Sequence, residues 1–207
     1  MHQFNVKTVS YKGSKRKLVP RIVELADEIG AETVFDAFSG TGIVSAAMRN
    51  YGYKVTGCDL NFSSYIFGKV FLEGYNPTVV KTHLEKINQL QPVKGWLSQN
   101  YSGVVVRKVR GTNEIAERPL GLTSVNASKI DAAREYIHKI TNISEKDKNA
   151  LIFSIIKGAD SVFNNSNDQK SSFKDWSNKS LKDVVFDVPT LINGPVGTQY
   201  QSDIFNL

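Results

Sequence analysis

The sequence predicts an α/β fold, because strand-like and helix-like segments alternate along its first 90 residues. A short apolar run ends in a Gly-x-Gly turn at residues 40–42, and a helical segment follows it. A second apolar run ends in an acidic residue, Asp59. Two strands with one helix between them form a βαβ unit of about the usual length, roughly 30 residues.

The first expected helix covers residues 18–29, where apolar side chains recur at three- and four-residue steps. Pro20 suits the first turn of that helix. A strand at 33–38, a helix at 43–51 closed by Gly52, and a strand at 53–59 complete the unit. This order accounts for the α/β assignment.

Further helices are expected at residues 63–72, 79–90, 126–141 and 144–162, the last with Ser144 as its N-cap. Polar or proline-containing segments at 164–172 and 189–197 are expected to be loops, and residues 199–205 a short strand. We therefore predict a core at residues 1–91, a mainly helical insertion at 92–195, and a strand at 196–207 that returns to the core.

Composition excludes several protein classes. The 207 residues are 41% hydrophobic and 22% charged, which is typical of a globular protein. The single cysteine, Cys58, rules out an internal disulfide or a multi-cysteine zinc site, and no metal is expected. No apolar run reaches membrane-spanning length, so we expect a cytoplasmic protein without a membrane partner. The formal charge of +6 suits a phosphate-rich partner, and equally an ordinary basic protein.

The Gly-x-Gly turn and Asp59 together indicate a nucleoside cofactor. Glycines let the backbone approach a ligand closely, and a carboxylate after the second strand can accept hydrogen bonds from both ribose hydroxyls. The third glycine of a dinucleotide fingerprint is absent, and Asp36 with Thr41 suits a cationic amino-acid group better than a pyrophosphate. S-adenosylmethionine has that chemistry. A plain strand–helix turn at Gly40 and Gly42, and a helix cap at Asp59, remain alternatives.

Several segments resemble Dam-like adenine-specific DNA methyltransferases. Residues 11–18 (YKGSKRKL) are similar to the family's N-terminal motif, 35–42 (FDAFSGTG) to its first cofactor motif and 58–60 (CDL) to its second. Residues 96–101, 126–131 and 159–164 resemble recurring segments of one bacterial and phage branch. Taken without the resemblance, the basic residues at 13–17 are a loop before a helix, and Asn126 and Asp131 cap or flank one.

The resemblance implies a Rossmann-like S-adenosylmethionine-dependent methyltransferase core, with the insertion as a candidate DNA-facing region. It also implies DNA as a partner and a set of cofactor-binding residues. These are Tyr11, Gly13, Lys15, Asp36, Phe38, Gly40, Thr41, Gly42, Asp59, Leu60 and Asp203. Asp59 would hold the ribose, Asp36 and Lys15 would lie near the methionine end, and Asp203 near the adenine. A surface aspartate close to the terminus is the alternative for Asp203.

The family's catalytic Asp-Pro-Pro-Tyr motif does not occur in this sequence. Residues 187–190 (DVPT) and 193–196 (NGPV) are the nearest approximations, and both lack the second proline and the aromatic residue. The sequence therefore predicts a core that is incomplete at its C-terminus and has no catalytic residue of its own.

Three hypotheses are compatible with these features. The chain is the cofactor-binding part of an adenine-specific DNA methyltransferase, as a fragment, a natural truncation or one half of a split enzyme, inactive alone and completed by a second polypeptide that carries the motif. Alternatively, it is a catalytically dead cofactor- or DNA-binding module of phage or mobile-element origin. Methylation of RNA or of a small molecule also remains open, because many methyltransferases share these cofactor motifs.

Overall fold

The computed structural model describes residues 6–10, 13–108, 115–119, 121–165 and 176–207, with side chains left out at 104–108 and 115–119. These residues divide into two compact units. The first unit contains Met1–Thr82, Asn142–Ser154 and Val188–Leu207, and the second contains His83–Thr141 and Ile155–Asp187. Two helices, α4 (Pro77–Asn88) and α7 (Glu145–Val162), have residues in both units.

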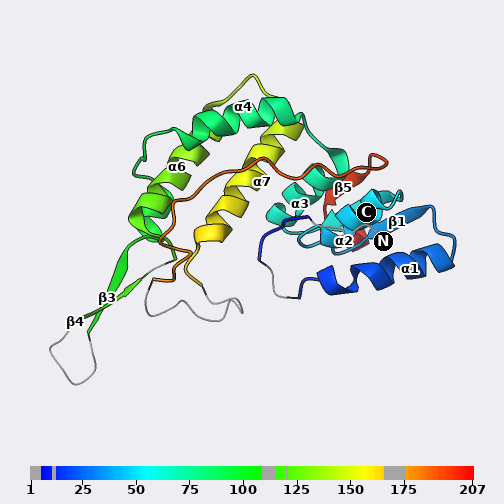
Figure 1. Ribbon diagram of the computed structural model, residues 1–207, viewed down its shortest axis with the longest axis horizontal. Helices are drawn as coiled ribbons and strands as arrows, with labels where there is room; N and C mark the ends of the chain where they lie inside the picture. The colour runs from blue at the N-terminus through cyan, green and yellow to red at the C-terminus, as the bar shows by residue number, and fades with distance from the viewer. Residues whose placement is uncertain (1–5, 11–12, 109–114, 120, 166–175) are drawn as a thin grey trace. The chain divides into compact units, whose positions relative to one another are not determined.

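The first unit is built on a parallel sheet in the order β1-β2-β5, where β1 is Thr33–Asp36, β2 is Lys54–Asp59 and β5 is Thr198–Gln201. Asp36 is paired with Gly57, and Asp59 with Gln201. β5, the red strand in Figure 1, is about 140 residues away from β2 in sequence and nevertheless pairs directly with it. Because all three strands are parallel, their carboxyl ends meet at one edge of the sheet.

Helices pack against this sheet. A 3₁₀ turn, η1 (Arg16–Leu18), leads into α1 (Val19–Glu28), and α2 (Ile43–Asn50) connects β1 to β2. After β2, α3 (Phe62–Gly68) continues as a π-helical turn, η2 (Lys69–Glu73), and a 3₁₀ turn, η3 (Ile204–Asn206), comes after β5. One core cluster joins α1, α2, β2 and η2 through the buried residues Val19, Val23, Ala26, Ala47, Met48, Tyr53, Val55 and Leu72.

A buried arginine fixes the loop that precedes β5. Arg49, near the end of α2, donates from Nε to the carbonyl oxygen of Pro195 at 2.9 Å and from Nη1 to that of Phe71 at 2.6 Å. A longer contact of 3.4 Å reaches the carbonyl of Gly194. Burial lowers the pKa of this guanidinium. Arg49 thus ties α2, η2 and the 194–197 loop together and sets where β5 begins.

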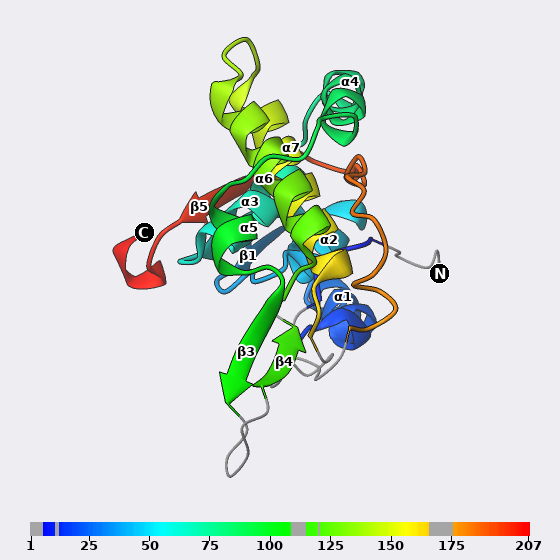
Figure 2. The same ribbon diagram turned by 90° about the vertical axis from the view of Figure 1, so that its left-hand side faces the viewer.

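The second unit combines helices with a small antiparallel sheet. It contains α5 (Trp96–Asn100), α6 (Ser124–Lys139), and the strands β3 (Val104–Lys108) and β4 (Ile115–Pro119). The two strands form a hairpin that extends away from α6 in both views (Figure 2). The sequence did not predict this hairpin.

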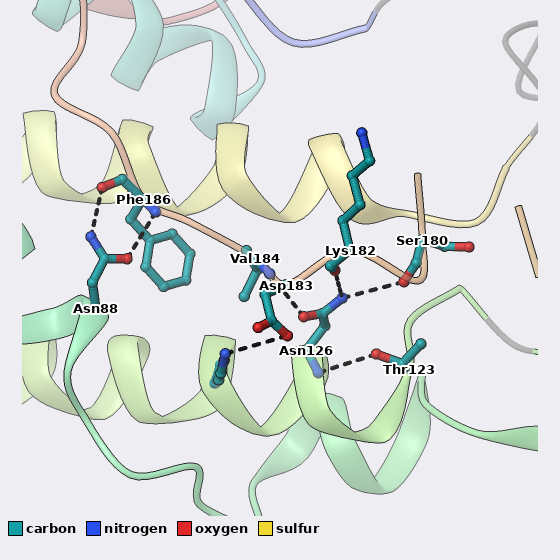
Figure 3. Close-up of polar contacts among 9 residues, drawn as sticks. Asn88, Thr123, Asn126, Ser180, Lys182, Asp183, Val184 and Phe186 are labelled. Carbon is teal, nitrogen blue, oxygen red and sulfur yellow. Dashed lines mark hydrogen bonds and ion pairs between the residues drawn. The ribbon is translucent and has the colours of Figure 1, made fainter. Parts of the chain in front are cut away.

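Two asparagines hold the extended segment 180–186 against the helices of this unit. Asn126 of α6 donates from Nδ2 to the carbonyls of Lys182 at 2.8 Å and Ser180 at 3.4 Å, and its Oδ1 accepts the Val184 N–H at 2.9 Å (Figure 3). Asn88 makes the same paired contact with the backbone N–H and carbonyl of Phe186, each at 3.0 Å. Amide side chains suit this task because each carries a donor and an acceptor.

Asp131, also on α6, caps a neighbouring helix. Its two oxygens accept the N–H groups of Leu97 at 3.1 Å and Ser98 at 2.8 Å, in the first turn of α5. A Cβ at Gly95 would lie 2.6 Å from the Asp131 carboxyl carbon, so only glycine fits there. Asn126 and Asp131 therefore have structural roles, which accords with the interpretation of these residues made without the family resemblance.

Most expected elements are present with shifted ends. The helices expected at 18–29, 43–51, 63–72, 79–90, 126–141 and 144–162 correspond to α1, α2, α3 with η2, α4, α6 and α7. Ser144 caps α7 as predicted, since its Oγ accepts the Asp147 N–H at 3.1 Å. The strand expected at 199–205 is shorter, because η3 begins at Ile204, and most of the loop expected at 164–172 lies outside the described residues.

Within the described residues, no helix combines the length and the apolar character needed to cross a bilayer.

Candidate functional site

Three aspartates lie at the carboxyl ends of the three parallel strands. Asp36 ends β1, Asp59 ends β2, and Asp203 comes two residues after β5. The order of the strands places Asp59 between the other two along the sheet edge. Ligands of open parallel sheets bind at this edge, and the three carboxylates favour a cationic one.

The loop from Ser39 to Gly42 joins β1 to α2 at this edge. Gly40 and Gly42 have φ values of 51° and 68°, a region in which residues with a Cβ are strained. At Gly42 a Cβ would also lie 2.9 Å from Cδ2 of Phe71. The Ser39 N–H donates to the Cys58 carbonyl at 3.0 Å, and the Gly42 N–H donates back to Ser39 at 2.8 Å. Both glycines are therefore required by the backbone conformation, and Gly42 also by its close approach to Phe71.

Asp59 connects the loop to the start of α3. Its Oδ2 accepts the Gly40 N–H at 2.8 Å, and its Oδ1 accepts the Asn61 N–H at 2.9 Å. The α3 cap is Asn61, whose Oδ1 accepts the Ser63 N–H at 2.8 Å, so Asp59 is not the helix cap. Each carboxylate oxygen has two lone pairs, and Asp59 therefore keeps acceptor capacity for a ligand.

Asp36 faces α2 and is partly removed from solvent. The buried Ser45 hydroxyl donates to its Oδ2 at 2.5 Å. Burial raises the pKa of the Asp36 carboxyl, the hydrogen bonds from Ser45 oppose this, and the charge of Asp59 adds a further upward contribution. A cation beside Asp36 would reverse the effect of burial, because it favours the ionised carboxylate.

Apolar side chains are exposed next to these polar groups. Phe38 precedes the loop and is 78% exposed, and Leu60 comes directly after Asp59 and is 71% exposed. Thr41, in contrast, is only 4% exposed. Phe38 and Leu60 are therefore accessible to a ligand. The Thr41 side chain is buried within the loop and is not.

The N-terminal motif is described only in part. Tyr11 lies outside the described residues. Gly13 has a φ of 87°, and the Lys15 ammonium donates to the Gly13 carbonyl at 2.8 Å in an exposed position. Among the residues that the structure describes, no ion pair joins Lys15 to Asp36. The structure thus does not bring these two expected neighbours into contact.

Asp203 is exposed and caps η3, since its Oδ1 accepts the Phe205 N–H at 3.0 Å. It lies at the same edge as Asp59, because Asp59 is paired with Gln201. The interpretation as a surface aspartate and the proposed contact with a ligand are both compatible with this position.

Sequence reasoning missed Gln199, whose side chain runs beneath the glycine loop. Its Nε2 donates to the Ser39 Oγ at 3.1 Å, and the residue is 3% exposed. A glutamine in a short polar strand carries no signal that separates this position from an outward one. The alternation of side chains along β5 indicates only that one of Gln199 and Tyr200 points inward.

A family model matches residues 11–196 of the chain, and it describes the D12 class N6 adenine-specific DNA methyltransferases. The chain belongs to that family. The match confirms the resemblance to adenine-specific DNA methyltransferases drawn from the sequence, and it makes adenine in DNA the substrate class of the family. No curated protein and no solved structure matches the chain.

The D12 methyltransferase match includes the N-terminal motif, the glycine loop, Asp59 and the whole second unit. β5 and Asp203 lie beyond it. The place of Asp203 at the sheet edge consequently rests on the strand pairing alone.

Proposed function

We propose that this chain binds S-adenosylmethionine at the carboxyl edge of the parallel sheet and is the cofactor-binding part of an adenine-specific DNA methyltransferase with a Rossmann-like core. The observation that carries the proposal is Asp59, whose carboxylate lies between the glycine loop and α3 with acceptor capacity left over. Family membership supplies the reaction class.

The residues at this edge fit the cofactor's parts. The free acceptor positions of Asp59 suit the two ribose hydroxyls, and Gly40 and Gly42 allow the ligand to approach the backbone. Exposed Phe38 and Leu60 offer apolar surface for the adenine ring or the thioether carbons. Asp36 suits the cationic amino group, and Asp203 the exocyclic amine of the adenine.

When bound, S-adenosylmethionine supplies an electrophilic methyl group on a sulfonium centre. The contribution of this chain is to bind the cofactor's cationic groups near the carboxylates and to orient it through Asp59 and the loop. These 207 residues contain no Asp-Pro-Pro-Tyr motif, and we propose that it is supplied from outside them, for example by a second polypeptide.

The two segments that come nearest to the motif have other contacts. The Tyr75 hydroxyl donates to the Pro189 carbonyl, and burial raises the pKa of Tyr75 to about 12. The carbonyls of Gly194 and Pro195 accept from Arg49. These contacts support the rejection of both segments as catalytic motifs.

Calorimetric titration of the purified chain with S-adenosylmethionine tests the cofactor assignment. Asp59→Ala should weaken binding about tenfold or more, because a hydrogen bond to a charged group is worth about 1.5–3 kcal/mol. Asp183→Ala is the control, since that aspartate is exposed and pairs with Lys129 in the second unit. Equal affinity of the wild-type and Asp59→Ala proteins would remove Asp59 from the site.

Methyl transfer from labelled cofactor to DNA tests the reaction. The chain alone should give no product, and addition of a family polypeptide that carries Asp-Pro-Pro-Tyr should give N6-methyladenine. The missing motif also favours a second candidate, a cofactor- or DNA-binding module without catalysis. Binding without product in every combination would favour that module and contradict the split enzyme.

A further inference from the structure

Gln199 extends from β5 toward the glycine loop and places its amide nitrogen between two acceptors. Nε2 donates to the Ser39 Oγ at 3.1 Å and to the Tyr200 carbonyl at 3.2 Å. Because a carbonyl oxygen only accepts, the atom beside Tyr200 must be the nitrogen, which fixes the orientation of the amide. Both N–H groups of the Gln199 side-chain amide therefore have acceptors.

Ser39 is the residue on which the loop turns. Its N–H is bound to Cys58 of β2, and its carbonyl accepts from Gly42 at the start of α2. The contact from Gln199 is a third attachment, made to the hydroxyl and coming from β5. With all three, the loop is fixed to β2, α2 and β5, and Gly40 can present its N–H to Asp59.

Two glycines make room for the rest of the Gln199 side chain. A Cβ built at Gly57 would lie 2.1 Å from Oε1, and one built at Gly68 would lie 2.0 Å from the same atom. Oε1 accepts no hydrogen bond among the residues that the structure describes. The oxygen instead occupies the space that a Cβ would take at each of the two glycines. Neither glycine has a positive φ, so both are required here by space alone.

A buried acceptor without a strong donor is costly, and an apolar side chain of the same size would avoid that cost. Glutamine is thus a poor choice for stability at this position. Unlike an apolar side chain of that size, glutamine supplies two N–H groups, which it directs at Ser39 and Tyr200.

We infer that Gln199 is a positioning residue for the cofactor loop, acting on S-adenosylmethionine through the Ser39 hydroxyl. The inference rests on the proposed function and names a residue that lies outside the family match. Gln199 does not touch the ligand. It sets the conformation of the loop that the ligand meets.

Titration of the variants with S-adenosylmethionine, together with urea unfolding, tests this role. Gln199→Leu keeps the bulk of the side chain and removes the donors, and it should weaken binding about five- to tenfold, as expected for one lost hydrogen bond. Gln89→Leu makes the same chemical change at an exposed position after α4 and should bind like wild type.

A double-mutant cycle separates positioning from a general loss of structure. If Gln199 acts through Ser39, then Ser39→Ala combined with Gln199→Leu should bind no more weakly than the weaker single variant. Full additivity of the two losses would overturn the inference.

A compensating pair gives a second readout. Gly68→Ala added to Gln199→Ala fills the space that the shortened side chain leaves, because the three atoms nearest to a Cβ at Gly68 all belong to Gln199. The urea midpoint of Gln199→Ala should rise in this pair, and the cofactor affinity should stay low. Recovery of affinity together with stability would show that packing, not the hydrogen bond, is what matters.

The outcomes also distinguish a failure of the proposed cofactor site from a failure of the role of Gln199. If wild-type protein binds the cofactor and Gln199→Leu binds within twofold of it, the role of Gln199 is refuted and the cofactor site stands. If wild-type protein does not bind at all, the proposed function fails and the role of Gln199 fails with it.

Discussion

The Asp36 carboxyl lies against Ser45 at the end of β1, and burial raises its pKa above the ordinary value of 3.8. A raised pKa means that the folded protein binds this proton more tightly than the unfolded chain does. The contribution of Asp36 to stability is therefore largest below pH 3.8 and falls as pH rises through the raised folded value.

Asp36→Asn should remove the pH dependence that Asp36 gives to the stability. It should also affect stability and cofactor affinity in different directions. Asparagine still accepts from Ser45 and carries no charge to desolvate, so the variant should unfold at an equal or higher urea concentration near pH 7. Its affinity for S-adenosylmethionine should fall, because the cofactor's amino group loses a carboxylate. Urea unfolding from pH 3 to 7, with calorimetry at pH 7, measures both. An unchanged affinity would place the methionine end elsewhere.

The geometry of the candidate site was predictable from the sequence only where its residues form a local motif. Gly40, Gly42 and Asp59 are indicated by strand ends and turn chemistry, and the structure places Gly40 in contact with Asp59. The partners of these residues were not predictable. Gln199 reaches Ser39 across 160 positions, and Ser45 faces Asp36 only because α2 begins where it does. Such contacts depend on tertiary packing, which single-sequence patterns do not encode.

At the scale of elements, Arg49 connects the end of α2 to the strand that returns to the sheet. Arg49→Met should lower the free energy of unfolding by about 1–3 kcal/mol, because the carbonyls of Phe71 and Pro195 lose their donor in the interior. Arg49→Lys should recover only part of this, since an ammonium cannot reproduce the planar fork of a guanidinium. Urea unfolding measured by circular dichroism gives the values. If Arg49→Met left the free energy of unfolding unchanged, β5 would be held by strand pairing alone.

Asn126 has a comparable role in the second unit, where it holds the segment at 180–184. Asn126→Leu should leave those backbone groups without partners and increase amide exchange in this segment and in α6, at a cost of about 1–3 kcal/mol. Cofactor affinity should not change. Hydrogen–deuterium exchange by mass spectrometry reports the local effect, with Asn100→Leu, an exposed residue of α5, as the control. Unaltered exchange at 180–184 would contradict this role.

The helices were predicted best where apolar residues recur at helical spacing over many positions, as in α1, α6 and α7. The β3–β4 hairpin was missed although its first strand begins with three consecutive valines, because a short apolar run without a recognised turn is compatible with several structures. The end of β5 was misjudged because Asp203 caps η3 and stops the strand. Capping by an acidic residue competes with strand extension, and tertiary contacts of the neighbouring residues decide between the two.

In the whole molecule, the family match and the candidate site overlap in the first unit. The match to the D12 methyltransferases runs through both units, and the sheet edge with its three aspartates lies in the first. A chain with a formal charge of +6 thus carries a local cluster of carboxylates where a cationic cofactor would bind.

Backbone amide resonances of ¹⁵N-labelled protein, recorded during titration with S-adenosylmethionine, test cofactor binding at the glycine loop most directly. The Gly40 amide is the best reporter, because its N–H donates to Asp59. We expect the Gly40, Gly42 and Leu60 resonances to shift in a saturable way, the Gly158 resonance in α7 to stay in place, and Asp59→Ala to abolish the shifts at the same concentration. Saturable binding that leaves Gly40 and Gly42 unmoved would contradict a cofactor site at this loop.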